Sequence, residues 1–235
     1  MKHSFVSAAR SGPGGAAPPP GGRRPRWRRR KDARPSEILD AALVEFVERG
    51  YAAARLEDVA RRAGVTKGTL YLYFDGKEAL FKATARAAVL PSVEAGEERV
   101  RSHTGTAREL VTDILRIRWD RVFNSPAGGI LKLLISEAGN FPDLARWYHD
   151  EIVVRANASL EQALELGIQR GEFRRLDIQQ AVYLALAPAV MAGLWKRSFM
   201  RAVQPPFDPA DYLENWIQTF LRGIESRPQR EESHA

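Results

Sequence analysis

The sequence predicts an all-α protein in which a small three-helix domain is followed by a larger helical domain. The first observation behind this prediction is that apolar residues recur at one- and three-residue steps after residue 34, as in the run Ile38, Leu39, Ala42, Leu43, Phe46 and Val47. Such stripes are typical of amphipathic helices. The second is that glycines stand where the first stripes end, with Gly50 and Gly64 suited to left-handed helix caps. With 235 residues, the chain is long enough to bury a sizeable core.

The N-terminal segment differs in composition from the rest of the chain. Residues 1–31 contain nine Lys and Arg and no acidic residue, which leaves 27 of the 36 basic residues against 29 acidic ones in the remainder. Because glycine, proline and arginine dominate it, we expect residues 1–33 to form a disordered basic arm, and residues 228–235 a disordered tail. The arm could follow a DNA minor groove or bind phosphates. It could equally be a solvated tail without a specific role, or an over-long predicted start.

The sequence lacks the patterns that would indicate an enzyme, a metalloprotein or a membrane protein. It contains no cysteine, which excludes disulfides and zinc–thiolate sites and fits the reducing cytoplasm. Its four histidines follow no metal-binding spacing, and there is no nucleophile elbow, P-loop or dinucleotide fingerprint. We therefore predict no catalytic residue, no metal and no cofactor. The longest apolar stretch, residues 181–195, is shorter than a membrane helix of roughly 20 residues and contains Pro188, so we expect a buried helix in a cytoplasmic protein and no membrane partner.

The N-terminal domain, predicted over residues 34–81, should contain three helices. Pro35 suits the first turn of the first helix, and Gly50 suits its end. A second helix would end at Gly64. A third would begin at Thr66, whose hydroxyl can cap it.

The second and third helices have the spacing of a helix-turn-helix. Small Ala60 stands where the two helices would cross, Gly64 allows the turn four residues later, and Leu70 anchors the third helix six residues further on. Together these spacings favour a helix-turn-helix motif at about residues 55–74, an arrangement typical of DNA-binding proteins. Helical hairpins with a purely structural role contain such residues too, so that alternative stays open.

The third helix should expose an uncharged face. At about 100° per residue, Leu70 and Phe74 share one side and would belong to the core. The opposite side then carries Gly68, Thr69, Leu72 and Tyr73. Such a face suits a DNA major groove, because hydroxyls can bond phosphates or base edges and leucine can contact thymine methyls. The alternative is that the bulky residues pack on another helix.

These residues resemble a known family. The stretch "ILDAALVEFVERGYAAARLEDVARRAGVTKGTLYLYFDGKEALF", residues 38–81, resembles the DNA-binding domain of the tetracycline-repressor (TetR) family, most specifically in "AGVTKGTLYLYF" followed by "KEALF". The resemblance implies a homodimer that binds a pseudo-palindromic operator in double-stranded DNA, usually as a repressor, and leaves it when a small-molecule effector enters the C-terminal domain. It also implies that Lys77 contacts a phosphate. The predicted DNA-binding residues are Arg55, Thr66, Lys67, Gly68, Thr69, Tyr71, Leu72, Tyr73 and Lys77.

Two positions depart from the family pattern. The family commonly has a threonine or serine pair before its second helix, where this chain has Ala54 and Arg55. A hydroxyl N-cap is therefore absent, and Arg55 could instead reach a phosphate. At Leu72 related proteins often carry a polar or aromatic side chain, so the bases that are read do not follow from the resemblance.

Residues 82–227 should form a helical effector-binding and dimerisation domain. A long helix is expected from Lys77 to about Arg101, kinked or split at Pro91, which makes that proline a candidate hinge. Apolar periodicity predicts one helix in each of three further segments, residues 107–123, 128–137 and 142 to about 171.

Large side chains of this second domain could line an effector cavity, or could be plain core. The candidates are Trp119, Phe123, Leu134, Glu137, Phe141, Trp147, Tyr148 and Tyr183. Polar groups that could orient a ligand, or could face solvent, are Arg118, Glu137, Asn140, His149 and Asn157. The apolar surroundings favour a hydrophobic or aromatic effector.

The last two predicted helices carry wide apolar stripes, over residues 178–190 and 212–224, with a loop at residues 203–209 between them. Two such stripes exceed what one intramolecular partner needs, so we expect a four-helix bundle across a two-fold axis. The predicted interface residues are Ala181, Ala185, Ala189, Tyr212, Trp216 and Phe220. Burial within the monomer is the alternative.

Taken together, these patterns predict an effector-responsive transcriptional regulator that is not an enzyme. The runner-up is a non-specific nucleic-acid-binding protein driven by the arginine-rich arm, with the helix-turn-helix in a structural part. The two differ in that phosphate-only binding ignores sequence and falls steeply with salt.

Overall fold

The computed structural model describes residues 35–200, 202–203 and 208–226. The predicted arm, the predicted tail and most of the 203–209 loop lie outside the described residues. The described part folds into helices, and an isolated antiparallel bridge joins Phe173 to Glu225. This confirms the all-α prediction. The helices are α1 (Pro35–Ala53), α2 (Leu56–Arg62), α3 (Lys67–Tyr71), α4 (Lys77–Arg101), α5 (Ala107–Trp119), η1 (Asp120–Asn124), α6 (Ala127–Glu137), α7 (Pro142–Tyr148), η2 (His149–Val153), α8 (Val154–Gln169), α9 (Ile178–Ser198) and α10 (Pro209–Ile224).

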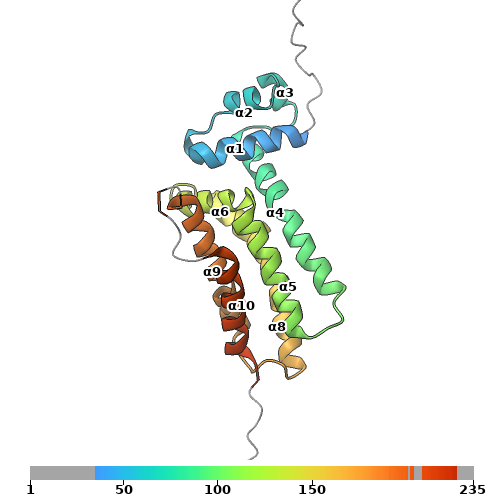
Figure 1. The fold of residues 1–235 in the computed structure, drawn as a ribbon. Helices are drawn as coiled ribbons and strands as arrows, with labels where there is room; N and C mark the ends of the chain where they lie inside the picture. The colour runs from blue at the N-terminus through green and yellow to red at the C-terminus, as the bar shows by residue number, and fades with distance from the viewer. Residues whose placement is uncertain (1–34, 201, 204–207, 227–235) are drawn as a thin grey trace, which may run out of the picture.

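The molecule is elongated, with α1, α2 and α3 grouped at one end (Figure 1). Helix α4 leads from this group into the larger helical domain, where α5 and α8 run beside it. Helices α9 and α10 lie together on the side of that domain away from α4 (Figure 1). The order of the elements therefore places the helix-turn-helix and the last two helices on different parts of the surface.

The first three helices end and begin where the sequence predicts. Gly50 has a φ of 81° inside α1, which breaks the regular helix there and leaves one more turn to Ala53. Gly64 has a φ of 71° between α2 and α3, a left-handed conformation that costs glycine little. Thr66 caps α3, since its side chain accepts a hydrogen bond from the Thr69 backbone N–H at 3.1 Å. Arg55 precedes α2 without a side-chain cap, as expected from the missing hydroxyl.

Helix α4 is not split at Pro91, because it continues from Lys77 to Arg101. Contacts on both sides of the proline hold it against its neighbours. Before it, Arg86 pairs with Glu151 of η2; after it, Arg155 of α8 pairs with Glu97 at 2.7 Å. The packing of α4 against α1, α5 and α8 holds both halves of the helix in place despite the backbone hydrogen bond that proline cannot donate.

Two of the segments predicted as single helices contain a π-helical turn. Residues 107–123 form α5 followed by η1, and the segment from residue 142 forms α7, η2 and α8. Apolar periodicity cannot reveal such a turn in advance, because one extra residue shifts the phase of the stripe only from that point on. Both π-helical turns border the internal cavity described below.

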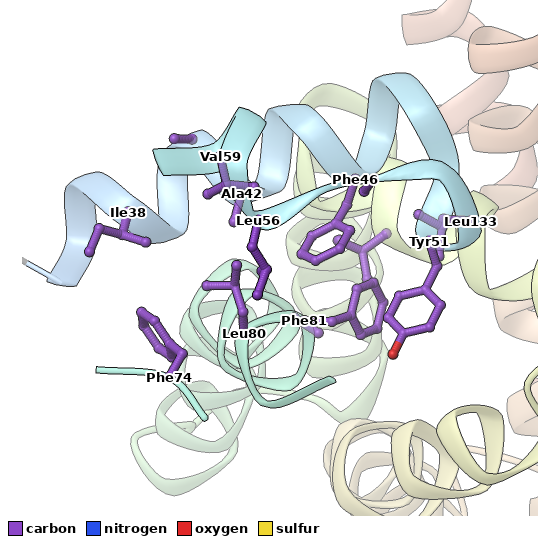
Figure 2. Packing of buried hydrophobic residues seen from close by; sticks show 14 of the residues in the cluster. Ile38, Ala42, Phe46, Tyr51, Leu56, Val59, Phe74, Leu80, Phe81 and Leu133 are labelled. Atoms are coloured by element: carbon purple, nitrogen blue, oxygen red, sulfur yellow. The ribbon is translucent and has the colours of Figure 1, made fainter. Parts of the chain in front are cut away.

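Buried apolar residues form two clusters. The first joins α1 to α4 with α6, α7 and η2, and it includes Phe46, Tyr51, Phe81 and Leu133; Figure 2 shows Phe46 directed toward Phe81. The second cluster joins α5, α8, α9 and α10. The first core therefore crosses the domain boundary predicted after residue 81, and the helix-turn-helix rests directly on the larger domain.

Candidate DNA-binding surface and internal cavity

Helix α3 presents an apolar and hydroxyl-bearing face to the outside. Leu70 is fully buried and Phe74 nearly so, whereas Leu72 is 82% exposed. Tyr71 and Tyr73 are 45% and 47% exposed. The orientation predicted from the helical period is thus observed, and no other described helix of this chain covers these side chains, contrary to the packing alternative.

Cations beside this face are already engaged by the protein. Lys67 pairs with Glu57 of α2, and its ammonium lies 5.7 Å from the centre of the Tyr71 ring. Both side chains are about half exposed to solvent, so the pair adds little stability. The hydrogen bond from Lys67 holds the pKa of Glu57 below its usual range, which keeps this carboxylate charged next to the exposed face.

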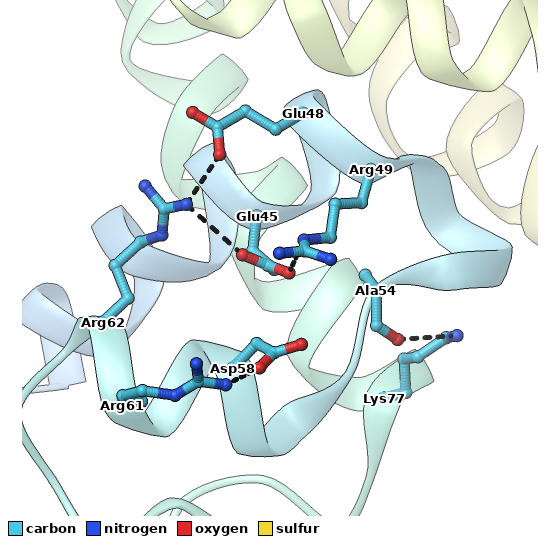
Figure 3. A network of polar contacts seen from close by, with 8 residues as sticks. All are labelled: Glu45, Glu48, Arg49, Ala54, Asp58, Arg61, Arg62 and Lys77. Carbon is cyan, nitrogen blue, oxygen red and sulfur yellow. Dashed lines mark hydrogen bonds and ion pairs between the residues drawn. The ribbon is translucent and has the colours of Figure 1, made fainter.

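Lys77 has a different environment from the one expected for a phosphate-contacting side chain. Its Nζ donates to the carbonyl oxygen of Ala52 at 2.8 Å. It also donates to the carbonyl oxygen of Ala54 at 3.1 Å (Figure 3). The ammonium also lies 4.9 Å from the centre of the Tyr51 ring, and burial lowers the pKa of Lys77. In this structure the lysine ties the start of α4 to the end of α1. Contact between Lys77 and a DNA phosphate stays a prediction.

An ion-pair network fixes α2 on α1 (Figure 3). The carboxylate of Glu45, which is almost completely buried, pairs with Arg49 at 2.7 Å and with Arg62 at 3.4 Å, and Arg62 also pairs with Glu48 at 2.6 Å. Arg61 pairs with Asp58 within α2. A buried carboxylate held by two arginines orients the helix-turn-helix on its support.

The larger domain contains a cavity of about 150 Å³. Its walls come from α4, α5, η1, α6, α7, η2, α8 and α9, and they are predominantly apolar. Valine and leucine residues of five elements contribute, among them Val89, Leu131, Leu186 and Val190. Polar side chains reach the wall at few points: Ser92, Arg118, Arg121, Tyr148 and Asn157.

Arg118 and Tyr148 are the buried ionisable groups of this wall. Arg118 is 7% exposed and donates through Nη2 to the carbonyl oxygen of Ala156. Burial lowers the pKa of Arg118 to about 10, so the guanidinium is still charged at neutral pH. Burial raises the pKa of Tyr148 to about 12. The phenol therefore stays neutral and able to donate a hydrogen bond.

Most of the residues predicted for the pocket lie elsewhere. Of the eight, Tyr148 lines the cavity. Phe123 instead borders a separate hollow of about 730 Å³ between α1, α6 and α9, where the ammonium of Lys196 lies 4.3 Å from its ring centre. The other six do not line this cavity: Trp119, Leu134, Glu137, Phe141, Trp147 and Tyr183.

Several of these side chains are engaged elsewhere, because large aromatic side chains gain much by packing against one another. Trp119 stacks on Phe123 with 4.2 Å between ring centres, and Phe141 packs edge-on against Tyr51 at 4.8 Å. Trp147 lies beneath the cations of α4, and its indole N–H donates to Glu151 at 2.5 Å. Glu137 bonds Asn140, Leu134 belongs to the first core cluster, and Tyr183 is 62% exposed.

On α9, the three alanines predicted for the dimer interface are buried within this chain. Ala181, Ala185 and Ala189 face the second core cluster, because small residues let α9 approach its own neighbours closely. The exposed apolar face of α9 is a different one, formed by Tyr183, Leu184 and Met191. Beside it, a hollow of about 370 Å³ between α9 and α10 is lined by Leu184, Pro188, Tyr212, Asn215, Trp216, Thr219 and Phe220, so the three residues predicted on α10 do border an open surface.

Helix α9 also has the length and composition of a membrane-crossing helix. It is 21 residues long, and a third of its most apolar window is buried inside the protein. Core helices of soluble proteins meet the same criterion of length and composition.

A short third helix with an outward apolar and hydroxyl-bearing face, supported by a second helix and a buried core, has the arrangement of a helix-turn-helix. Comparison with known proteins agrees. A model described as "Bacterial regulatory proteins, tetR family" matches residues 38–84, and one described as "Tetracyclin repressor-like, C-terminal domain" matches residues 101–204. The chain belongs to the TetR family of bacterial transcriptional regulators.

Individual relatives extend over much of the chain. YdeS of Bacillus subtilis, an uncharacterized HTH-type transcriptional regulator, is 29% identical over 168 residues, which cover 69% of this chain and 79% of that protein. FasR of Mycolicibacterium smegmatis, an HTH-type transcriptional activator, is 37% identical over 92 residues, 39% of this chain and 42% of that protein. The crystal structure of FadR from Bacillus subtilis, in complex with stearoyl-CoA, superposes with a TM-score of 0.65 at 21% identity, covering 82% of this chain and 100% of that one.

Proposed function

We propose that this TetR-family regulator is a cytoplasmic homodimer that binds a pseudo-palindromic operator, represses transcription there, and is released when a small effector fills its internal cavity. The observation that carries the proposal is the exposed face of α3, where Leu72 and Tyr73 stand uncovered beside Thr69. A solvated helix would gain nothing from this composition. A helix in a major groove would use it to contact thymine methyls, base edges and phosphates.

Dimerisation is supported by the exposed apolar face of α9 and the adjoining hollow on α10. Tyr183, Leu184 and Met191 are each about two-thirds exposed, and α9 carries no charged residue between Asp177 and Lys196. An uncharged, apolar helix face of this extent is best covered by the same face of a second copy across a two-fold axis. The two recognition helices would then lie about 34 Å apart, in successive major grooves.

Release by an effector is supported by the position of α6, which lines the cavity and also packs against α1 of the DNA-binding domain. Helix α6 contributes Ala127 and Leu131 to the cavity wall and Leu133 to the first core cluster. Helices α1 and α6 are in close contact, since a Cβ at Gly129 would lie 2.6 Å from Val47. An effector that displaces α6 would therefore move α1. The effector would weaken DNA binding by the difference between its affinities for the DNA-binding and the released conformation, typically about 1–3 kcal/mol.

Repression is the sign that occupancy of a promoter site gives by default, because a bound dimer blocks access to the DNA. The relative named as an activator shows that the family likeness alone does not settle the sign. Transcription from a template that carries the selected operator should fall when the protein is added and recover with effector. A rise on addition of the protein alone would replace repressor by activator in this proposal.

The deciding experiment is selection of bound duplexes from a random pool at about 150 mM salt, with the full chain and with a chain that lacks residues 2–31. We expect both to recover one inverted repeat, because α3 reads base edges and the dimer imposes symmetry. If only the full chain recovers DNA and no motif emerges, the protein is the non-specific, arm-driven binder instead. Recovery of a single half-site without an inverted repeat would contradict the dimer, but it would still support recognition of the sequence by α3.

A further inference from the structure

Arg118 stands out among the arginines of the larger domain because it is buried without an acidic partner. Arg86, Arg99 and Arg155 each pair with a carboxylate. Within the part of the chain that the structure describes, Arg118 instead bonds a backbone carbonyl, that of Ala156. A buried guanidinium without a counter-charge is unfavourable. The arrangement is therefore costly unless another anion completes it.

The cavity offers a place for such an anion. Arg118 belongs to its wall, and a guanidinium has five N–H donors in a planar fork that matches a carboxylate. No Asp or Glu lines the cavity among the described residues, so nothing there would repel a negative charge. The neutral hydroxyl of Tyr148 and the amide of Asn157 add polar contacts to the same wall.

The rest of the wall sets the size and the apolar part of the ligand. A cavity of about 150 Å³ bounded by Val89, Leu186 and Val190 has the volume that holds a single benzene ring in an engineered apolar cavity. A sugar or nucleotide would leave its hydroxyls unpaired against these walls. A coenzyme A thioester with a long acyl chain far exceeds this volume.

We propose that the cavity binds a small amphipathic carboxylate, with the carboxylate held by Arg118 and one aromatic ring or short branched chain packed against the apolar wall. The inference rests on the proposed function, since such an acid would be the effector that releases DNA. It narrows the predicted hydrophobic or aromatic effector to one that carries a negative charge. Charge and volume together define the class, and the fork of the guanidinium favours a planar anion.

The test begins with the wild-type full chain, so that it does not depend on a variant that folds. Calorimetric titrations would compare benzoate, phenylacetate and isovalerate with the neutral isosteres benzamide and benzyl alcohol, and with stearoyl-CoA. We expect saturable binding of at least one acid, and at least about tenfold weaker binding of its neutral isostere, because a hydrogen bond between charged groups is lost. No binding by any of the three acids, equal binding of an isostere, or binding of stearoyl-CoA alone would overturn the proposal.

Variants then locate the carboxylate. Arg118→Gln should abolish the preference for the acid over its isostere, whereas Arg116→Gln should leave it unchanged. Arg116 is a fair control, because it lies on the same helix, is half exposed and pairs with Glu214 on the outside. A preference that survives Arg118→Gln in a folded protein would overturn the assignment of Arg118. Because operator binding is measured separately, a protein that binds the acid but selects no DNA would contradict the proposed function and leave this site standing.

Discussion

Helices α3 and α9 both expose large apolar side chains, yet their surroundings differ. Helix α3 has five residues, and the exposed Leu72 and Tyr73 in the turn directly after it lie near Lys67 and two threonine hydroxyls. Helix α9 has 21 residues and carries no charge along the exposed face formed by Tyr183, Leu184 and Met191. An apolar face mixed with cations and hydroxyls suits a polyanion with methyl groups in its groove, whereas an uncharged apolar face suits a copy of itself.

The largest effect is expected from a charge on the α9 face. Leu184→Glu would bury a carboxylate without a partner in the proposed dimer, so the dimer should weaken by roughly a hundredfold or more, and operator binding should be lost with it. Sedimentation at several concentrations measures the first effect and a DNA-binding titration the second. Val154→Glu, the same change at an exposed apolar position of α8, is the control. Dimers that persist in Leu184→Glu would place the interface elsewhere.

The next prediction concerns a change that should weaken DNA binding and leave the dimer intact. Tyr73→Ala should weaken specific operator binding by roughly 10- to 100-fold, because it removes a ring and a hydroxyl from the groove-facing side of α3. The dimer and the thermal unfolding temperature should stay as they are, since Tyr73 is half exposed. Tyr73→Phe separates the contribution of the hydroxyl from that of the ring. Unchanged operator affinity in Tyr73→Ala would remove α3 from the DNA interface.

A smaller and salt-dependent effect is expected from the basic arm. Deletion of residues 2–31 removes nine basic side chains, so affinity at low salt should fall. The slope of log affinity against log salt should decrease by about 0.9 for each phosphate that the arm neutralises in the full chain. The selected sequence should not change. An unaltered slope would mean that the arm takes no part in binding.

The smallest effect tests the negative charge beside α3. Glu57→Gln should raise DNA affinity by roughly two- to fivefold at low salt, because it removes a carboxylate near the phosphates and frees Lys67 from its ion pair. Lys67 holds the pKa of Glu57 below its usual range, so Glu57 stays ionised in weak acid. The gain should therefore be the same from about pH 5.5 to about pH 8. Glu165→Gln, with the same charge change on α8, should have no effect; a gain as large there would reflect net charge alone.

The sequence predicted α3 better than α9 for a reason that lies in the residues. On α3, Leu70 and Phe74 fix the buried side, so the exposed side follows from the helical period. On α9, alanines and bulky residues occur on more than one face, and either face could have been the inner one. The alanine face is inside because α9 must approach its own neighbours first. Which face stays exposed depends on how α5, η1, α6, α8 and α10 pack against α9.

The cavity could not be predicted from aromatic residues, because its wall comes from eight elements that are far apart in the sequence. Most aromatic candidates pack in or against the two core clusters, Tyr183 is exposed, and Tyr148 lines the cavity. The residue that most restricts the class of ligand is Arg118, which the sequence analysis named as one of five polar candidates and could not distinguish from the others. The signal that could have singled it out is its position in the apolar stripe of α5, in phase with Val111, Ile114 and Leu115 on the buried side.

The core that runs from α1 through α6 has a consequence for how the protein unfolds and how it can be recombined. A fragment that ended after residue 81 would expose the sides of Phe46 and Tyr51 that now rest against Leu133 and Phe141. We therefore expect helices α1, α2 and α3 to unfold together with α6 in one cooperative transition, and not as an independent domain. In a chimaeric regulator joined at residue 81, the α1 of one protein would pack against the α6 of another, and their contact surfaces would not match. A DNA-binding domain exchanged between relatives must therefore include α6, or the residues of the α1–α6 contact must be redesigned.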